Sequence, residues 1–238
     1  MNEELAIALL HRARRLAGVD VRDLMDADAA MSPGKGGVGQ HIERALGLSP
    51  RFDEVDDPES GVEVKTLPVA FRGEVATVQQ GTFVTSASTD SLLAESWATS
   101  RVRRKLSRVL FVPIVEVGDR APVDGDRAPL QRLVGTAFLW SPPPDVGAQL
   151  RADWEDLSDL VARGLGFAVT ARRGVYLQVR PKARDAEYLR RARVVDDDDV
   201  LLRPQGFYLR RIVTIRALQE AIDLDGTART RWVPGQTR

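Results

Sequence analysis

The chain has 238 residues, with 34 lysines and arginines, 34 aspartates and glutamates, two histidines and no cysteine. Hydrophobic residues make up 43% and charged residues 29%, which excludes wholesale disorder. The lack of cysteine excludes disulfides, thiolate metal sites and a cysteine nucleophile. The longest central run without polar residues, Val109–Val115, is too short to span a bilayer, and the acidic start predicts no signal peptide. We therefore expect a soluble, cytoplasmic protein without a membrane partner.

Hydrophobic periodicity and turn residues divide the chain into intermixed helices and strands. The predicted elements are helices over residues 3–17 and from about Val38, strands over 62–67 and 82–85, partly helical chain over 92–106, strands over 108–117 and 135–140, a helix over 150–161, a β-hairpin over 167–180 and a last helix ending near residue 222. This mixture predicts an α/β (mixed α+β) fold with a central mixed sheet, in one domain over residues 1–222. Residues 223–238 are predicted to form a polar, mobile tail.

A glycine-rich segment precedes the second predicted helix. Residues 34–39, Gly-Lys-Gly-Gly-Val-Gly, are similar to the start of the phosphate loop of partition-type ATPases. That loop needs a lysine and then Ser or Thr after its last glycine, but Gln40 and His41 stand there, and no apolar strand precedes it. We interpret the segment as a flexible approach to a helix. Lys35 would be a cation beside that helix N-terminus, which attracts phosphate.

An acidic pattern around the first predicted strand indicates a different chemistry. Asp56 precedes Glu63 by seven residues, and Glu63 and Lys65 share one face of the strand, about 6–7 Å apart. Carboxylates suit Mg²⁺, and a lysine can orient water and stabilise charge on phosphorus during phosphodiester hydrolysis. Glu43, beside the apolar stripe of the preceding helix, is a candidate third carboxylate. Charges that alternate along a half-exposed strand commonly form only its solvated face, and this pattern alone leaves that alternative open.

Basic residues cluster locally although the net charge is zero. Five of them, Arg101, Arg103, Arg104, Lys105 and Arg108, lie within eight residues with no acid among them. Residues 172–193 and 203–216 are also rich in arginine, whereas residues 20–63 are acidic. A surface for the phosphate backbone of nucleic acid is therefore available, with ordinary surface ion pairs as the alternative.

Several short blocks of this sequence, taken together, resemble the MutH family, the strand-nicking endonucleases of methyl-directed DNA mismatch repair. The resemblance rests on Lys35-Gly36, Glu43, Asp56, Gly61–Thr66, Thr99-Ser100, Val102–Leu106, Leu139–Pro142, Asp153–Leu157, Tyr176–Ala183 and Gly206–Leu209. The blocks follow in order over nearly the whole chain, up to about residue 222. Several blocks of four or more residues in register are far more specific than a single Glu-x-Lys pattern.

The resemblance implies a PD-(D/E)XK nuclease: a restriction-endonuclease-like central mixed sheet flanked by helices, with two lobes forming a DNA cleft. It implies that Glu43, Asp56 and Glu63 hold Mg²⁺, for which Mn²⁺ can substitute. Lys65 would be the catalytic lysine and Lys105 a further active-site lysine. Asp57 is an adjacent rival of Asp56, and the seven-residue spacing favours Asp56.

The resemblance also implies how DNA is read. Lys35 would lie near the scissile strand, and the other expected contacts to double-stranded DNA are Phe83, Arg180, Pro181, Lys182 and Tyr208. The family reads GATC sites, and Tyr208 would lie near the adenine whose N6-methylation blocks cleavage, because the methyl group removes a donor and adds bulk in the major groove. A MutL-type ATPase is the expected partner of a monomeric enzyme.

Two alternatives remain at this point. A restriction endonuclease would use the same chemistry to cut both strands without repair partners. A non-catalytic DNA-binding module would keep only the fold, although such a module has no need for clustered like charges.

Overall fold

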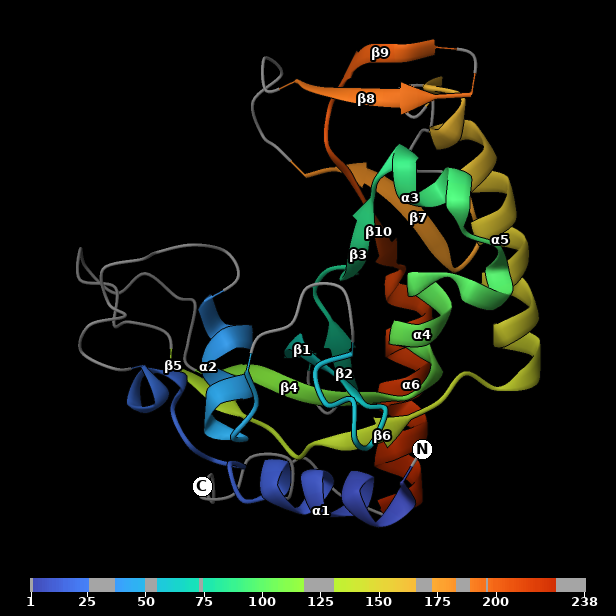
Figure 1. Ribbon diagram of the computed structural model, residues 1–238. Helices are drawn as coiled ribbons and strands as arrows, with labels where there is room; N and C mark the ends of the chain where they lie inside the picture. Colours follow the sequence, from blue (N-terminus) through green and yellow to red (C-terminus); the bar gives the residue numbers. More distant parts are fainter. Residues whose placement is uncertain are drawn as a thin grey trace.

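Two β-sheets, a β-hairpin and the surrounding helices make up the protein, as the computed structural model shows (Figure 1). The structure describes residues 2–25, 37–49, 55–72, 75–117, 131–165, 173–182, 189–195 and 197–225. The helices are α1 (Glu3–Arg14), η1 (Val21–Leu24), α2 (Gly37–Ala45), α3 (Thr89–Ala94), η3 (Trp97–Thr99), α4 (Arg101–Ser107), α5 (Pro144–Ala162) and α6 (Arg211–Asp225). The strands are β1 (Glu63–Arg72), β2 (Val75–Val78), β3 (Thr82–Ala87), β4 (Val109–Val117), β5 (Gln131–Val134), β6 (Phe138–Trp140), β7 (Leu177–Pro181), β8 (Arg190–Val194), β9 (Asp197–Leu202) and β10 (Gln205–Leu209).

The main sheet has the strand order β2-β1-β4-β5, and β6 pairs with the other end of β4. β1 and β4 run parallel, in a register that sets Glu63 opposite Val109, and the other pairs are antiparallel. β4 is buried on both faces, with Phe111 on one side and Leu110 on the other. This double burial explains its unbroken apolar sequence. The predicted mixed sheet with flanking helices is confirmed.

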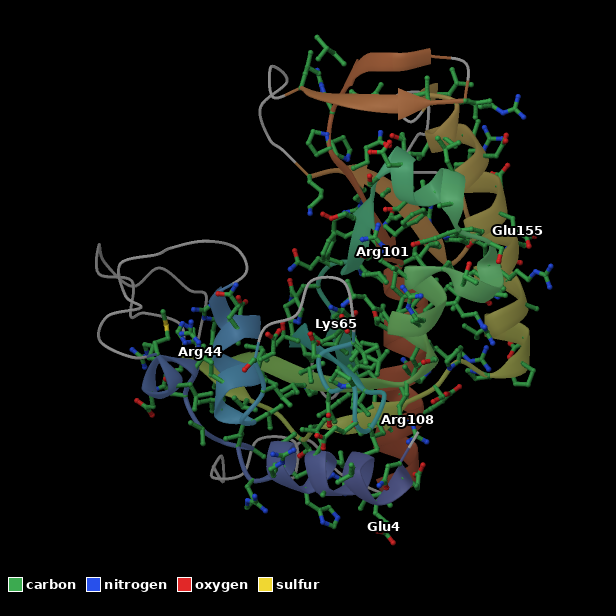
Figure 2. All side chains as sticks on the ribbon, viewed as in Figure 1. Glu4, Arg44, Lys65, Arg101, Arg108 and Glu155 are labelled. Atoms are coloured by element: carbon green, nitrogen blue, oxygen red, sulfur yellow. The ribbon has the colours of Figure 1, made fainter. Side chains whose placement is uncertain are left out.

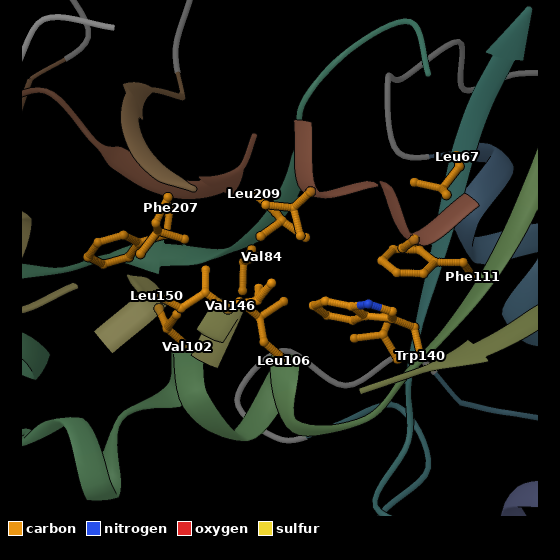
Figure 3. Close-up of a cluster of buried hydrophobic side chains, with 14 of the residues drawn as sticks. Leu67, Val84, Val102, Leu106, Phe111, Trp140, Val146, Leu150, Phe207 and Leu209 are labelled. Carbon is orange, nitrogen blue, oxygen red and sulfur yellow. The ribbon is translucent and has the colours of Figure 1, made fainter. Parts of the chain in front are cut away.

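The second sheet is antiparallel, with the order β3-β10-β7, and β8 and β9 form a separate hairpin. The inner face of the second sheet contributes Phe207 and Leu209 to a hydrophobic core. The main sheet contributes Leu67 and Phe111 to the same core, as Figure 3 shows. α4 and α5 pack into the same core, with Leu106 among the contacts. This shared core therefore holds the two sheets against each other.

Helices α1 and α2 cover the opposite face of the main sheet, where a second core contains Leu9, Ile42 and Leu110. Asn2 caps α1, because its Oδ1 accepts the N–H groups of Glu4 and Leu5 at 3.1 and 3.3 Å. None of the helices in the described ranges has the length and hydropathy that a membrane-spanning helix needs.

One predicted strand is shorter in the structure. Residues 135–140 were expected to form a strand, but only residues 138–140 do so, as β6. The preceding strand β5, which was not predicted, ends at Val134, and β5 and β6 pair with different ends of β4. Residues 135–137, between β5 and β6, lie opposite only two residues of β4, Val112 and Pro113. The ladder therefore contains one extra residue, as in a β-bulge. Pro113 lacks an N–H group and accepts from Gly135 instead, which explains the interruption at this point.

The later part of the chain contains further differences. The strand predicted in the 167–180 hairpin is present as β7, but β7 pairs with β10, and the predicted partner over 167–170 lies outside the described residues. The β8–β9 hairpin was not predicted, since its arginine- and aspartate-rich sequence lacks apolar alternation. α6 continues to Asp225, and the rest of the predicted tail lies outside the described residues.

Two leucines of α1 test the burial of this helix. Leu9 is 0% exposed and Leu5 is 37% exposed. We expect Leu9→Ala to lower the free energy of unfolding by about 2–5 kcal/mol, because it removes buried methyl groups and leaves a cavity. Leu5→Ala should cost about 1 kcal/mol or less. Urea unfolding of both variants gives the comparison, and equal losses would contradict this packing of α1.

Candidate active site

The centre of the site is a buried carboxylate held between two amines. Glu63 is the first residue of β1 and is 0% exposed. Its Oε1 lies 2.5 Å from Lys65 Nζ, and Lys105 Nζ donates to Oε1 at 3.1 Å and to Oε2 at 3.0 Å. The prediction that Glu63 and Lys65 share one face of β1 is therefore confirmed. The alternative hypothesis, that these charges only form a solvated face of the strand, is wrong for Glu63.

Lys105 reaches Glu63 from α4. The helix begins at Ser100, whose Oγ accepts the Arg103 N–H at 3.1 Å. Val102 and Leu106 anchor α4 in the core, so the buried side of the helix also presents Lys105 to the start of β1. The side chain of Lys105 is 6% exposed and that of Lys65 is 19% exposed, which makes Lys65 the more accessible amine.

The turn before β1 distinguishes Asp56 from Asp57. Asp56 is buried, and its Oδ2 accepts the backbone N–H of Val64 at 2.8 Å, beside Glu63. Asp57 instead closes the turn: its backbone pairs with Val62, and its Oδ2 accepts the hydroxyl of Ser60 at 2.6 Å. Asp56 is therefore the aspartate that lies at the cluster, as the seven-residue spacing favoured.

Glu43 belongs to the same electrostatic cluster, although it comes from α2 on another part of the chain. Burial, with the nearby charges of Asp56 and Glu63, raises the pKa of Glu43 to about 7, against the opposing effect of the two lysines. Burial and Glu63 likewise raise the pKa of Asp56 above its ordinary value. The structure thus brings together the five predicted residues of the catalytic set.

The donor set fits a hard divalent cation. Glu43, Asp56 and Glu63 offer carboxylate oxygens, the ligands that Mg²⁺ prefers. Burial first, and neighbouring carboxylates second, raise the pKa values of Glu43 and Asp56, and a bound cation would favour their charged forms. Among the described residues, no three histidine, aspartate or glutamate side chains are already arranged as a metal-binding group, and both oxygens of Glu63 contact amines.

Four of the five predicted residues at the second sheet meet on its outer face, and the fifth, Pro181, lies at the end of β7. The rings of Phe83 and Tyr208 lie edge to face with centroids 5.3 Å apart. Arg180 stands over the Tyr208 ring at 5.6 Å, and Lys182 Nζ lies 5.0 Å from the centroid of Phe83. Pro181, between them, is exposed at the end of β7. We call these five residues the aromatic–cationic surface.

Burial raises the pKa of the Tyr208 phenol, while Arg180 acts in the opposite direction. The hydroxyl therefore stays protonated at neutral pH and keeps its donor. Lys35, the remaining predicted DNA contact, lies outside the described residues.

Sequence reasoning missed two residues at this surface. A Cβ on Gly206 would lie 2.7 Å from Phe83 Cε2, so a glycine lets the ring cross the backbone of β10. Gln178 lies opposite Tyr208 in the β7–β10 ladder. The predicted hairpin over 167–180 held a signal for Gln178, since residues two apart on a strand share a face and Gln178 stands two before Arg180.

The basic run of α4 has a different role from the one its composition suggests. Arg101 pairs with Glu95 at 3.2 Å and Arg108 with Glu3 at 2.5 Å, and Figure 2 marks both arginines at opposite ends of the helix. Lys105 points inward to Glu63. Three cations of this run thus pair with acids of the protein. The alternative of ordinary ion pairs holds for Arg101 and Arg108, whereas Lys105 belongs to the buried cluster.

This mixed sheet, with a Glu-x-Lys strand beside an aspartate from the preceding turn, defines a restriction-endonuclease-like nuclease. Within this class, the chain belongs to the MutH family of DNA mismatch repair endonucleases. The family model described as "DNA mismatch repair enzyme MutH" matches residues 50–153.

Relatives named "DNA mismatch repair protein MutH" extend the similarity along the chain. The protein of Pectobacterium atrosepticum is 40% identical over 217 residues, covering 87% of this chain and 88% of the relative. That of Shigella flexneri is 39% identical over 214 residues, with the same coverage. That of Vibrio cholerae is 37% identical over 219 residues, covering 89% and 94%. The chain is therefore an endodeoxyribonuclease of DNA repair.

The pKa of Glu43 predicts a pH-dependent stability of the metal-free protein. Between its ordinary value of 4.5 and about 7, the folded protein holds a proton that the unfolded chain has lost. The free energy of unfolding should therefore fall as pH rises through this window. Glu43→Gln should reduce the decline, whereas Glu4→Gln, at an exposed position of α1 that Figure 2 marks, should leave it unchanged. Urea unfolding in EDTA between pH 5 and 7.5 measures the free energy of unfolding of the unaltered protein and both variants. The same dependence on pH in all three proteins would contradict the prediction.

Proposed function

We propose that this endonuclease hydrolyses one strand of double-stranded DNA at unmethylated GATC-like sites, with Mg²⁺ as its cofactor and Mn²⁺ as a substitute. The observation that carries the proposal is the buried Glu63 between Lys65 and Lys105, with Asp56 and Glu43 beside it. Such a cluster has the acids and amines that phosphodiester hydrolysis needs.

Glu43, Asp56 and Glu63 would hold the cation. A bound Mg²⁺ supplies Lewis-acid stabilisation of the charge on the phosphoryl oxygens. The hydrogen bond from the Val64 N–H to Asp56 Oδ2 keeps that carboxylate oriented toward the cluster. The turn closed by Asp57 and Ser60 holds Asp56 next to β1.

The two lysines have separate roles in this proposal. Lys65, the more accessible amine, orients the attacking water and stabilises the negative charge that develops on phosphorus. Lys105 contacts both oxygens of Glu63 and holds that carboxylate in place. The water oxygen attacks phosphorus in line and forms a new P–O bond, while the bond to the 3′ oxygen of the preceding sugar breaks. The attacking water gives up a proton to solvent, and the 3′ oxygen takes one from solvent and leaves as a hydroxyl.

The aromatic–cationic surface would contact the DNA. Arg180 and Lys182 supply donors and positive charge, Phe83 and Tyr208 supply ring faces and edges, and Pro181 is exposed beside them. The protonated hydroxyl of Tyr208 can approach the exocyclic amine of adenine in the major groove, where a methyl group adds bulk. Lys35 is proposed to contact the scissile strand, and the two lobes are proposed to enclose the DNA.

We further propose that the enzyme is a monomer, works in the cytoplasm on chromosomal DNA and is recruited by a MutL-type ATPase. The names of the relatives, DNA mismatch repair protein MutH, support a place in mismatch repair. A cutter of both strands, the alternative, would convert a supercoiled plasmid with a single site directly to the linear form. A strand-nicking enzyme would yield the open circle.

Glu63→Gln tests the catalytic cluster. We expect it to slow nicking of a supercoiled plasmid in Mg²⁺ by at least about 100-fold, because it removes a charged oxygen from the proposed cation site. Glu59→Gln, at an exposed position in the turn before β1, is the matched control and should retain normal activity. Circular dichroism and DNA binding without metal would show that the variant is folded. Normal nicking by folded Glu63→Gln protein would reject the assignment.

Matched duplexes that are unmethylated, hemimethylated or fully methylated at one GATC site test the reading of adenine. We expect cleavage of the unmethylated strand in the first two and none in the third. Tyr208→Phe should reduce discrimination against the methylated site by about tenfold, since it removes one hydrogen-bonding group at the base. Tyr176→Phe, in the chain that leads into β7, is the control for removing a tyrosine hydroxyl outside the aromatic–cationic surface. Equal cleavage of all duplexes by the unaltered enzyme would contradict methyl-directed reading.

A further inference from the structure

A buried carboxylate outside the active site ties α5 to the second sheet. Asp153 is 4% exposed. Its Oδ1 accepts the N–H of Val175 and the Nε2–H of Gln149, both at 2.9 Å. Its Oδ2 accepts the N–H groups of Val175, Tyr176 and Leu177 at 3.0, 2.6 and 2.8 Å. Three successive backbone donors therefore converge on one charged group, an arrangement that stabilises an anion strongly.

These three donors belong to the chain that leads into β7. The same strand bears Arg180, and its ladder with β10 bears Tyr208. The carbonyl of Tyr176 accepts the N–H of Arg210 at 2.8 Å, so the segment is also joined to the end of β10. Asp153 thus fixes the start of the strand that presents the aromatic–cationic surface.

The turn before β7 has a backbone conformation that directs these donors to the carboxylate. Gly174 has φ +79°, and a Cβ there would lie 2.0 Å from the carbonyl oxygen of Leu177. Only glycine fits such a turn without displacing the backbone. Residues 175–177 are therefore fixed in two ways: by the turn at Gly174 that precedes them and by their hydrogen bonds to Asp153.

The neighbouring residue of α5 connects the same helix to the active site. The ring of Trp154 packs on Trp97, with centroids 5.9 Å apart. Trp97 begins η3, which leads directly to Ser100, the cap of α4. α4 in turn places Lys105 on Glu63. Figure 1 shows α5 running alongside both β7 and α4.

We propose that Asp153 is a positioning residue that sets the second sheet relative to the Glu63–Lys105 cluster and thereby determines how well the enzyme discriminates between DNA sequences. The inference rests on the proposed function and adds a determinant of its specificity. Its physical basis is that hydrogen bonds to base edges form only within a narrow range of distance and angle, so a displaced reading surface loses affinity and discrimination while the cluster still cuts the DNA that is bound. Arg180, only three residues beyond the last donor that Asp153 binds, would be displaced if that attachment loosened.

Asp153→Asn tests the proposal, because it keeps the shape and replaces one acceptor oxygen by an NH₂ group that faces backbone donors. We expect the KM for a cognate duplex to rise about tenfold and the cleavage ratio between the cognate and single-base-variant duplexes to fall about tenfold. The single-turnover rate at saturating cognate DNA should change by less than about threefold. Asp159→Asn, on the same helix with an exposed Asp159–Arg163 pair, is the matched control and should change none of these values.

A second variant covers a failure of Asp153→Asn to fold. Gln149→Met removes one donor to Asp153 and leaves the backbone hydrogen bonds in place, so a smaller loss of discrimination in the same direction supports the proposal. An unchanged cleavage ratio and KM in the folded variants would overturn it, as would a fall in the saturating rate with discrimination intact.

Binding separates this inference from the proposed function. Fluorescence anisotropy without metal measures the preference for the cognate duplex independently of cleavage. If the unaltered chain binds that duplex preferentially but does not cut, the proposed chemistry fails, and loss of the preference in Asp153→Asn still supports the positioning role. No preference in the unaltered chain would overturn the inference.

Discussion

The burial of Glu63 without access to water is the constraint on which the rest of the structure depends. A carboxylate in such a position needs compensating charge and hydrogen bonds, which Lys65 and Lys105 supply from β1 and α4. Removing one partner of a buried ion pair typically costs about 3–5 kcal/mol. The pairing of β1 with β4 and the packing of α4 must therefore hold both amines in place. The same arrangement buries Glu43 and Asp56 near Glu63, and burial together with the neighbouring carboxylates raises the pKa of both groups.

A shared core places this charged cluster beside a second surface of quite different chemistry. Residues of the main sheet, α4, α5 and the inner face of the second sheet pack into one another, with Phe111 and Phe207 among them. The outer face of the second sheet then presents rings and cations to solvent. A close-packed interior transmits displacements from one element to its neighbours. The contacts of Asp153 and Trp154, adjacent on α5, lie along such a connection.

Local charge, and not the net charge, decides what this chain can bind. Acidic and basic residues are equal in number, yet basic residues cluster in some segments of the sequence and acidic residues in others. Arg101 and Arg108 are engaged in ion pairs within the protein, whereas Arg180 and Lys182 lie over aromatic rings at the exposed end of β7. Cation–π contacts of this kind orient the cations on a surface without neutralising them. The composition of the α4 segment alone suggested a binding surface, but tertiary contacts assign Lys105 to the cluster.

The sequence by itself determined the elements whose patterns are local. Alternation along β1 set Glu63 and Lys65 on one face, and the apolar run of β4 predicted a buried strand, because side-chain direction follows from backbone period. The sequence blocks that resemble the MutH family indicated the family. They also indicated the residues of the Glu63 cluster and of the aromatic–cationic surface. Only the tertiary structure decided that Ser60 engages Asp57 and leaves Asp56 for the cluster, that Pro113 divides β5 from β6, and that β7 pairs with β10. It also revealed the attachment of Asp153 to the start of β7. These features depend on contacts between residues distant in sequence, or on which of two equivalent groups finds a partner, and no local pattern encodes either.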